Sequence, residues 1–181
     1  MNQPAKPAAE IFDVAYLVIS GAATADRCPD ILRGLVDLGF PTVIALPTPN
    51  ASRVLAPRDL AAVPGVQVVE SYFDLAIRPS PPRGVVLFAP CGFNSLNKLA
   101  QGIADSLALS VVAEAIGRAT PVIVAPSLNQ PLLDHPVARA SLRTLPTWGV
   151  ILVPPLDDGS GPRLAPTGRL LDAVRPFAGR G

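Results

Sequence analysis

Histidine is almost absent from this 181-residue sequence, which contains a single one, His135. A Ser-His-Asp triad and a multi-histidine metal site both depend on histidine, so neither is expected. The two cysteines, Cys28 and Cys91, are too few for a disulfide framework or a cysteine-rich zinc site. We therefore expect no metal. The sequence does not exclude an enzyme that uses a Ser-Lys pair or two carboxylates, although no such pair stands out.

Charge is also scarce, and it is balanced: Lys and Arg total 15 against 14 for Asp and Glu, which leaves a formal net charge of +1. No basic surplus indicates a nucleic-acid or anionic membrane partner. No apolar run reaches the roughly 20 residues that span a bilayer. The N-terminal stretch "MNQPAKPAAE" lacks the apolar core of a signal peptide. We therefore expect a cytoplasmic protein without nucleic-acid or membrane partners.

Hydrophobic residues, by contrast, make up 49% of the sequence, enough for a sizeable core. Short apolar runs alternate with segments of helical periodicity. The runs that predict strands are 14–20, 42–47, 66–70, 84–90, 121–126 and 149–155, and the expected helices are 27–40, 94–117 (with a break near Gly102), 130–146 and 166–178. Strands that are apolar throughout indicate a parallel sheet covered on both faces. The sequence predicts an α/β protein with a Rossmann-like doubly wound parallel sheet in a three-layer αβα sandwich. Residues 14–178 would form this single domain after a flexible tail, 1–13.

Small polar residues follow five of these strands. They occur in "SGAAT" (20–24), "PTPNAS" (47–52), "PCGFNSLN" (90–97), "PSLNQP" (126–131) and "PPLDDGSG" (154–161). In a doubly wound sheet, ligands bind beyond the carboxyl ends of the strands. Any one of these residues could simply cap a helix. Because five strand ends carry similar small polar residues, a nucleotide-like cofactor is favoured instead. Backbone N–H groups and helix N-termini would hold it. Neither a Gly-x-Gly-x-x-Gly fingerprint nor a Walker loop is present, and FMN, with one phosphate and an isoalloxazine ring, fits a small site without those motifs.

The segment "PCGFNSLNKLAQGIADSL" (90–107) resembles the P-A-S-A-N-T…K-x-A-x-G-x-x-D-N-L motif of the homo-oligomeric flavin-containing cysteine decarboxylases. That family includes phosphopantothenoylcysteine decarboxylase and the peptidyl-cysteine decarboxylases of lantibiotic biosynthesis. Likewise, "PSLNQPLLDHP" (126–136) is similar to the family's P-x-M-N-x-x-M-W-x-x-P motif. The positions that match directly are Pro90, Asn94, Lys98, Gly102, Asp105, Leu107, Pro126, Asn129 and Pro136. Ser95 replaces a threonine, while Gly92 and Phe93 depart from the family's serine and alanine.

The resemblance implies a flavoprotein fold with FMN bound at a subunit interface, in homotrimers that sometimes form homododecamers. It implies oxidative decarboxylation of a cysteine-derived thiol acid, either a C-terminal peptidyl cysteine or a small molecule. Asn129 would be the catalytic residue that holds the substrate carboxylate. The expected cofactor-binding residues are Ser20, Gly21, Ala22, Thr48, Ala51, Pro90, Gly92, Phe93, Asn94, Ser95, Asn97 and Asp105.

Two features of the family are missing from this sequence. The histidine that precedes the family's fourth strand has no counterpart, since Ala76 lies near its position, and residues 157–166 contain no cysteine. An FMN-binding protein without decarboxylase activity, acting as a carrier, a sensor or a partner of a peptide-modifying enzyme, therefore stays open. A flavin prenyltransferase-like enzyme is disfavoured because Asn129 is kept.

Three further expectations concern side-chain environments. Cys91 follows a strand near the expected flavin, and we expect an inert packing residue; the alternative is a reactive thiol, whose pKa a helix N-terminus would lower. His135 is expected to be solvated.

The segment 106–117 is apolar over much of its circumference, which predicts a helix buried from more than one side. Because an isoalloxazine ring needs apolar walls on both faces, we expect a neighbouring subunit to cover that helix and one wall.

Overall fold

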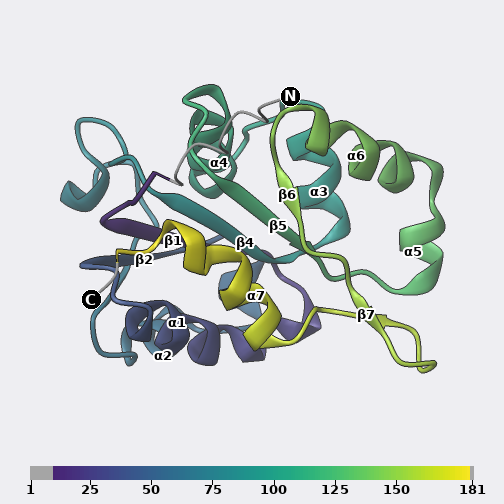
Figure 1. Ribbon diagram of the computed structural model, residues 1–181, viewed down its shortest axis with the longest axis horizontal. Coiled ribbons are helices and arrows are strands. Elements are labelled where there is room, and N and C mark those ends of the chain that lie inside the picture. Colours follow the sequence, from purple (N-terminus) through teal and green to yellow (C-terminus); the bar gives the residue numbers. More distant parts are fainter. Residues whose placement is uncertain (1–9, 180–181) are drawn as a thin grey trace, which may run out of the picture.

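Six parallel strands form the central sheet of the computed structural model, which describes residues 10–179 (Figure 1). They are β1 (Val14–Ile19), β2 (Thr42–Pro47), β3 (Val66–Val68), β4 (Val85–Cys91), β5 (Val122–Pro126) and β6 (Ile151–Leu152). Their order is β3-β2-β1-β4-β5-β6, and every neighbouring pair is parallel. This is the doubly wound order, in which successive strands are added outward in both directions from β1. The predicted fold class is confirmed.

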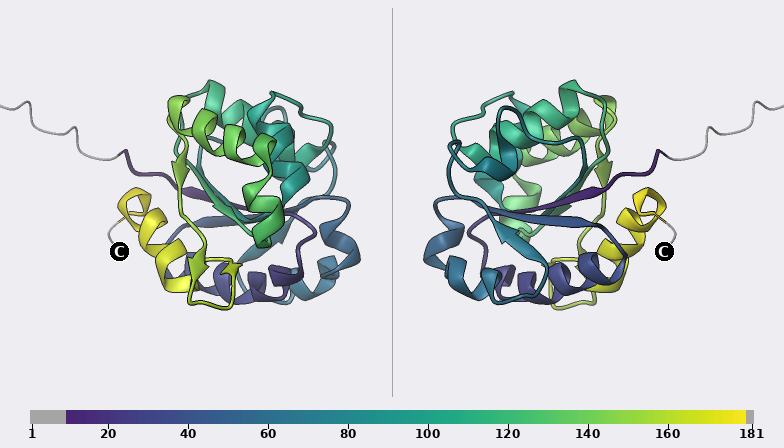
Figure 2. Two further views of the ribbon diagram at one scale, coloured as in Figure 1. Left: turned by 90° about the vertical axis from the view of Figure 1, so that its right-hand side faces the viewer. Right: turned by 90° about the vertical axis from the view of Figure 1, so that its left-hand side faces the viewer.

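Helices cover both faces of the sheet. They are α1 (Cys28–Asp37), α2 (Pro57–Ala61), α3 (Phe93–Ala100), α4 (Leu107–Gly117), α5 (Gln130–Asp134), α6 (Pro136–Thr147) and α7 (Thr167–Val174). Figures 1 and 2 show α1, α2 and α7 on one face, with α3, α4 and α6 on the other. Alternate residues of β1 enter two separate hydrophobic cores: Leu17 packs with the first layer, and Tyr16 and Val18 pack with the second. Period-two alternation thus gives three layers.

Local sequence explains where several elements end. The predicted break in the helical block 94–117 is confirmed, since α3 and α4 are separated by a loop in which Gly102 has a φ of +70°. The predicted helix 130–146 is divided at His135, whose ψ of 131° lies outside the helical range. The predicted strand 149–155 pairs only over Ile151–Leu152, because the prolines at 154 and 155 have no N–H for a ladder. A short antiparallel hairpin of β7 (Leu156–Asp157) and β8 (Pro162–Arg163) follows.

The N-terminal boundary lies slightly earlier than the start of β1. Phe12 is buried and forms an isolated bridge with Ala178, beside the 3-10 helix η4 (Arg175–Phe177). Residues 1–9 of the expected tail lie outside the described residues. Within residues 10–179, no helix has both the length and the apolar composition needed to cross a membrane.

Another part of the same chain covers much of the outer surface of α4, the helix expected to meet a neighbouring subunit. The proline-rich connection from β3 to β4 crosses this helix. Tyr72 donates its hydroxyl hydrogen to Ser110 (2.6 Å), and Arg118 donates to the Pro81 carbonyl (2.7 Å). Tyr16, from β1, donates to the Pro82 carbonyl (2.7 Å). Contacts within one chain therefore bury the apolar side chains of α4, and this helix gives no evidence for a subunit interface.

Gly84 joins this connection to β4 at a point where no side chain fits. A Cβ there would lie 2.5 Å from the Val14 carbonyl oxygen and 2.9 Å from the Tyr16 ring. Overpacking of this kind costs about 1–3 kcal/mol, so we expect Gly84→Ala to lower the free energy of unfolding by that amount in urea denaturation. Gly117→Ala is the matched control, because a Cβ at Gly117 meets nothing within 4 Å. An unchanged midpoint for Gly84→Ala would contradict the packing described.

Candidate functional site

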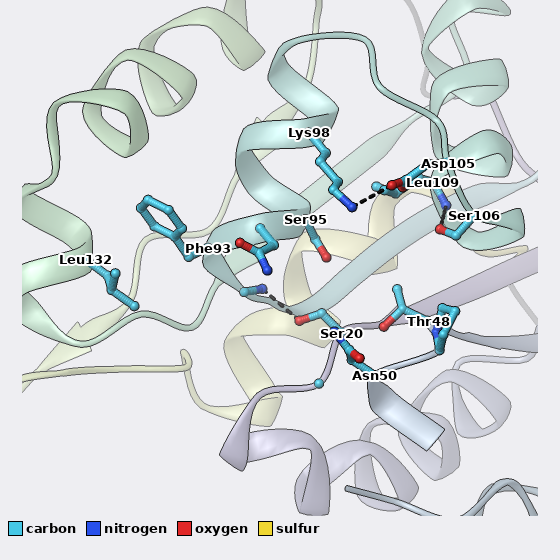
Figure 3. Close-up of a pocket in the computed structure, with 14 residues that line it drawn as sticks. Ser20, Thr48, Asn50, Phe93, Ser95, Lys98, Asp105, Ser106, Leu109 and Leu132 are labelled. Carbon is cyan, nitrogen blue, oxygen red and sulfur yellow. Dashed lines mark hydrogen bonds and ion pairs between the residues drawn. The ribbon is translucent and has the colours of Figure 1, made fainter. Parts of the chain in front are cut away.

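A cavity of about 560 Å³ opens beyond the carboxyl ends of β1, β2 and β4 (Figure 3). It lies where the sheet order reverses between β1 and β4, which is where doubly wound sheets bind ligands. Its volume falls within the range of about 300–1,000 Å³ typical of small-molecule sites. The residues that line it are Ser20, Gly21, Thr48, Pro49, Asn50, Gly92, Phe93, Asn94, Ser95, Lys98, Asp105, Ser106, Leu109 and Leu132.

The Ser20 hydroxyl joins the ends of β1 and β4 at the floor of the cavity. Its Oγ donates to the Pro90 carbonyl (2.8 Å) and accepts from the Gly92 N–H (2.7 Å). The Ser20 backbone N–H also donates to the Pro90 carbonyl (3.1 Å). The hydroxyl hydrogen is therefore already used within the protein. Ser20 shapes the site by fixing Gly92, the residue from which α3 begins.

The loops after β1 and β2 approach each other closely at Gly21. A Cβ on Gly21 would lie only 2.7 Å from the Asn50 carbonyl oxygen, so no other residue fits without moving the backbone. Thr48, at the end of β2, accepts the Ala51 N–H through its Oγ1 (3.3 Å) and keeps its hydroxyl hydrogen available. The two loops together close one side of the cavity with small, neutral groups.

Unused hydrogen-bonding groups gather around this floor. Within residues 10–179, the side chains of Asn50, Asn94 and Ser95 make no hydrogen bond to the rest of the chain. Helix α3 has no side-chain cap, and its first helical bond runs from the Leu96 N–H to the Gly92 carbonyl (2.9 Å). The N–H groups of its first turn therefore face the site without acceptors. Together with the helix dipole, they favour an anionic group such as a phosphate.

Apolar side chains border the cavity at Phe93 and Leu132, seen together at the left of Figure 3. The Phe93 ring meets the edge of the His135 ring, with centroids 5.2 Å apart and an interplanar angle of 84°. His135 is exposed, as expected, and its Nδ1 accepts the Val137 N–H (3.2 Å), which caps α6. His135 does not line the cavity, but its ring helps to hold the Phe93 wall in place.

The charged residues in the lining are Lys98 and Asp105, and they neutralise each other. The Lys98 Nζ lies 2.6 Å from an Asp105 carboxylate oxygen, and both side chains are exposed to a similar degree. The cavity therefore presents no unpaired charge. A ligand would be held by neutral donors, the start of α3 and apolar contacts. No group of three or more potential metal ligands occurs within residues 10–179.

Most of the residues predicted for the cofactor lie around this cavity. The structure brings together Ser20, Gly21, Thr48, Gly92, Phe93, Asn94, Ser95 and Asp105. Ala22, Ala51, Pro90 and Asn97 are not in the lining. Pro90 is buried within β4, and its carbonyl serves Ser20. Asn97 is also buried, where its Oδ1 accepts from the Ser141 hydroxyl (2.8 Å) and joins α3 to α6.

Asn129, the predicted catalytic residue, is exposed at the start of α5 and lies outside the lining. Its Oδ1 accepts the Leu132 N–H (3.1 Å), so it caps the helix that carries one wall of the cavity. The lining residues that the sequence prediction missed are Pro49, Asn50, Lys98, Ser106, Leu109 and Leu132. Asn50 and Lys98 lie inside the motifs already singled out and could have been found there. The two leucines resemble ordinary core residues and carry no such signal.

Comparisons with known proteins agree with this geometry. The protein-family model described as "Flavoprotein" matches residues 11–178. A coenzyme A biosynthesis bifunctional protein CoaBC of Thermococcus kodakarensis is 28% identical over 145 residues, which are 77% of this chain and 36% of that protein. The chain thus spans about a third of the length of such bifunctional relatives. Phosphopantothenoylcysteine decarboxylase of Mus musculus is 25% identical over 145 residues, covering 75% of this chain and 70% of that one.

Two solved structures show the same fold. One is a PPC decarboxylase mutant complexed with pantothenoylaminoethenethiol, with a TM-score of 0.77, 22% identity, and coverage of 91% of this chain and 97% of that chain. The other is the FMN-dependent cysteine decarboxylase TvaF from thioviridamide biosynthesis, with a TM-score of 0.67, 24% identity, and coverage of 77% and 88%. At these identities the likeness establishes the fold.

The two thiols behave as packing residues. Cys28 and Cys91 are both fully buried. Burial raises the pKa of the Cys28 thiol to about 12 and raises that of Cys91 as well. This environment agrees with the expected inert packing residue at position 91 and not with the alternative of a reactive thiol, because removal from water disfavours the thiolate.

We expect neither thiol of the native protein to react with a disulfide reagent at pH 8, and both to react in denaturant. Each thiol stays protonated in the folded state, whereas the unfolded chain ionises above about pH 8.5. The free energy of unfolding should therefore be insensitive to these groups at neutral pH and fall as the pH rises beyond that value. Rapid labelling of one thiol in the native protein would contradict the burial of Cys91.

Proposed function

This chain belongs to the flavoprotein family, and we propose that it binds FMN in the cavity and oxidatively decarboxylates a cysteine-derived thiol acid. The observation that carries the proposal is the match of the family model to residues 11–178, together with a cavity at the β1–β4 switch point. Relatives and structural neighbours described as cysteine decarboxylases support it. The substrate would be the C-terminal cysteine of a peptide or a small molecule.

The residues present fit FMN. The acceptor-free first turn of α3 and the Thr48 hydroxyl suit the phosphate, which neutral donors can hold without a cation. Gly21 supports this assignment, because its missing side chain lets two strand-end loops close around a small anionic group. The amides of Asn50 and Asn94 and the Ser95 hydroxyl can hydrogen-bond a polar ring edge, while Phe93 and Leu132 offer apolar contact. When bound, FMN supplies a two-electron oxidant.

The proposed reaction is a two-electron oxidation followed by loss of carbon dioxide. The thiol would lose its S–H hydrogen and one hydrogen from the adjacent carbon, giving a C=S bond, and bound FMN would supply the acceptor for these two electrons. The bond to the carboxylate then breaks, carbon dioxide leaves, and the electron pair of that bond moves toward the C=S group. The protein's part is to orient the substrate and exclude water. In this proposal, Asn129 holds the departing carboxylate through its side-chain amide, which stays exposed while its oxygen caps α5.

A second candidate is FMN binding without decarboxylation. The observation that favours it is the absence of histidine from the cavity lining: the single histidine, His135, caps α6 and contacts Phe93. Ala76, near the position of the family's histidine, offers no proton-transferring group. Such a protein would serve as a carrier, a sensor or a partner of a peptide-modifying enzyme.

We also propose that the protein assembles as a homotrimer or a multiple of it, such as a dodecamer. An isoalloxazine ring is buried when bound, whereas this cavity is open to solvent between Phe93 and Leu132 on one side and Leu109 on the other (Figure 3). A neighbouring copy could cover the open side of the ring.

The purified protein is expected to be yellow and to release FMN, not FAD, on denaturation. Incubated anaerobically with peptides ending in cysteine, in amounts equal to the bound flavin, it should yield products lighter by carbon dioxide plus two hydrogen atoms. The same peptides with a C-terminal serine are the control, because a hydroxyl is not oxidised in this way. A protein that takes up no FMN would overturn both candidates, whereas FMN binding with unchanged peptides and small thiol acids would favour the second.

Two variants separate the proposed roles of the asparagines. Asn94→Ala should weaken FMN binding by about 1–3 kcal/mol, the usual cost of leaving a partner without its hydrogen bond. Asn129→Ala should retain FMN and lose turnover, and Asn129→Ser is its matched control, since serine keeps the helix cap but lacks the amide. Turnover restored by Asn129→Ser would mean that Asn129 acts only as a cap. Loss of FMN from Asn129→Ala would show that the division of roles is wrong.

A further inference from the structure

An apolar groove of about 240 Å³ lies at the amino ends of β5 and β6, at the end of the sheet opposite the candidate functional site. Trp148 and Ile151 line it and remain 43% and 40% exposed. Phe177 of η4, Pro121 and Ile116 also belong to the lining. Single apolar residues are common on protein surfaces, but large apolar side chains gathered around one hollow mark a contact surface.

The groove combines aromatic walls with one unused hydrogen-bond donor. Within residues 10–179, the indole N–H of Trp148 donates to no acceptor. Aromatic-lined grooves of this kind bind proline-rich segments in the polyproline II conformation, whose backbone carbonyls are free to accept a hydrogen bond. The chemistry of the groove therefore favours a short proline-rich segment as its occupant.

The electrostatic surroundings of the groove favour a cation within that segment. Helices α4 and α6 both end beside the groove, through Ile116 and through Trp148, the C-cap residue of α6. Neither helix has a basic residue in its last turn. Arg118, which follows α4, is already engaged by Glu114 and the Pro81 carbonyl. Because helix C-termini carry a partial negative charge, a lysine or arginine at this position would be stabilised.

The first described residues of the chain lie close to the groove. The Phe12 N–H donates to the carbonyl of Phe177 (3.0 Å), and the bridge between Phe12 and Ala178 is parallel, so the chain before Phe12 runs back alongside Phe177. Glu10 forms an ion pair (3.1 Å) with Arg83, which lies just before β4, the strand between β1 and β5. The segment that precedes Glu10 therefore begins on the side of the sheet edge that carries the groove.

That segment has the length and composition that the groove requires. Its sequence includes Pro4-Ala5-Lys6-Pro7, which places two prolines three residues apart with a lysine between them. Neighbouring strands lie about 5 Å apart, so β5 and β6 are within about 10 Å of β4. Residues 4–9 can span about 19 Å in the polyproline II conformation, which is enough to cross that distance.

We propose that residues 4–7 dock into the Trp148–Phe177 groove of their own chain. The two proline rings pack on Trp148 and Phe177, a backbone carbonyl of the segment accepts the indole N–H, and Lys6 lies beside the ends of α4 and α6. The contact closes the amino edge of the sheet at the short strand β6. It is separate from the cavity at the carboxyl ends of the strands and does not depend on FMN.

Trp148 is the single tryptophan of the sequence, so its fluorescence reports on the groove directly. In the full-length protein, the double variant Pro4→Ser, Pro7→Ser should shift the emission of Trp148 to longer wavelength and increase its quenching by acrylamide, because the indole becomes exposed to water. Circular dichroism should be unchanged. The double variant Ala8→Ser, Ala9→Ser alters the same segment outside the two prolines and should behave as the wild type. Identical emission and quenching in the wild type and the proline variant would overturn the docking.

A nitroxide label tests which chain supplies the segment. The native cysteines are buried, so a label on Gln3→Cys is selective, and it should quench Trp148 strongly. The same label on Ser160→Cys, in the β7–β8 hairpin beyond the carboxyl end of β6, is the control and should not quench. Labelled Gln3→Cys, Trp148→Phe protein, refolded together with unlabelled wild type, should leave the wild-type emission unquenched. Quenching in that mixture would overturn the assignment to the same chain, and no quenching in the labelled Gln3→Cys protein alone would overturn the contact.

Discussion

The hydrogen-bonded bridge made by Ser20 is the constraint on which the site depends. In a doubly wound sheet, the chain leaves β1 and β4 toward opposite faces, so their carboxyl ends diverge and leave a crevice. The Ser20 hydroxyl crosses that crevice by donating to the Pro90 carbonyl and accepting from the Gly92 N–H. This fixes the residue before α3, and hence the direction in which the free N–H groups of that helix point. Gly21 then allows the loop after β2 to close the adjoining side.

The central strands could be predicted almost to the residue, whereas the periphery could not. Strands β1 and β2 are continuous apolar runs buried on both faces, so burial and sequence pattern coincide. At β6 the apolar run 149–155 extends past the pairing, because proline removes the donors that a strand requires. Apolar periodicity on α4 correctly indicated burial from several sides. It could not show that the covering surface comes from residues 71–84 of the same chain, since that depends on the tertiary path of a loop.

The candidate site was predictable to the extent that it consists of strand ends. Asn94 and Asn97 illustrate the limit, because both lie in one motif, three residues apart on α3. Asn94 faces the cavity, while Asn97 turns inward to Ser141 on α6. Their difference is set by how α3 packs on α6, which the motif does not encode. Leu109 and Leu132 were missed for a related reason, because a cavity wall and a core use the same apolar residues.

The central claim is that FMN occupies the cavity between the strand ends, and amide hydrogen exchange with and without FMN tests it most directly. Free N–H groups at the start of α3 and in the loops after β1 and β2 exchange with solvent unless a ligand accepts their hydrogen bonds. The account predicts that FMN slows exchange at Gly21, at Asn50 and in residues 93–95, whose N–H groups have no acceptor within the protein, and leaves the β7–β8 hairpin unchanged. Protection confined to other parts of the chain, with none at these positions, would contradict it.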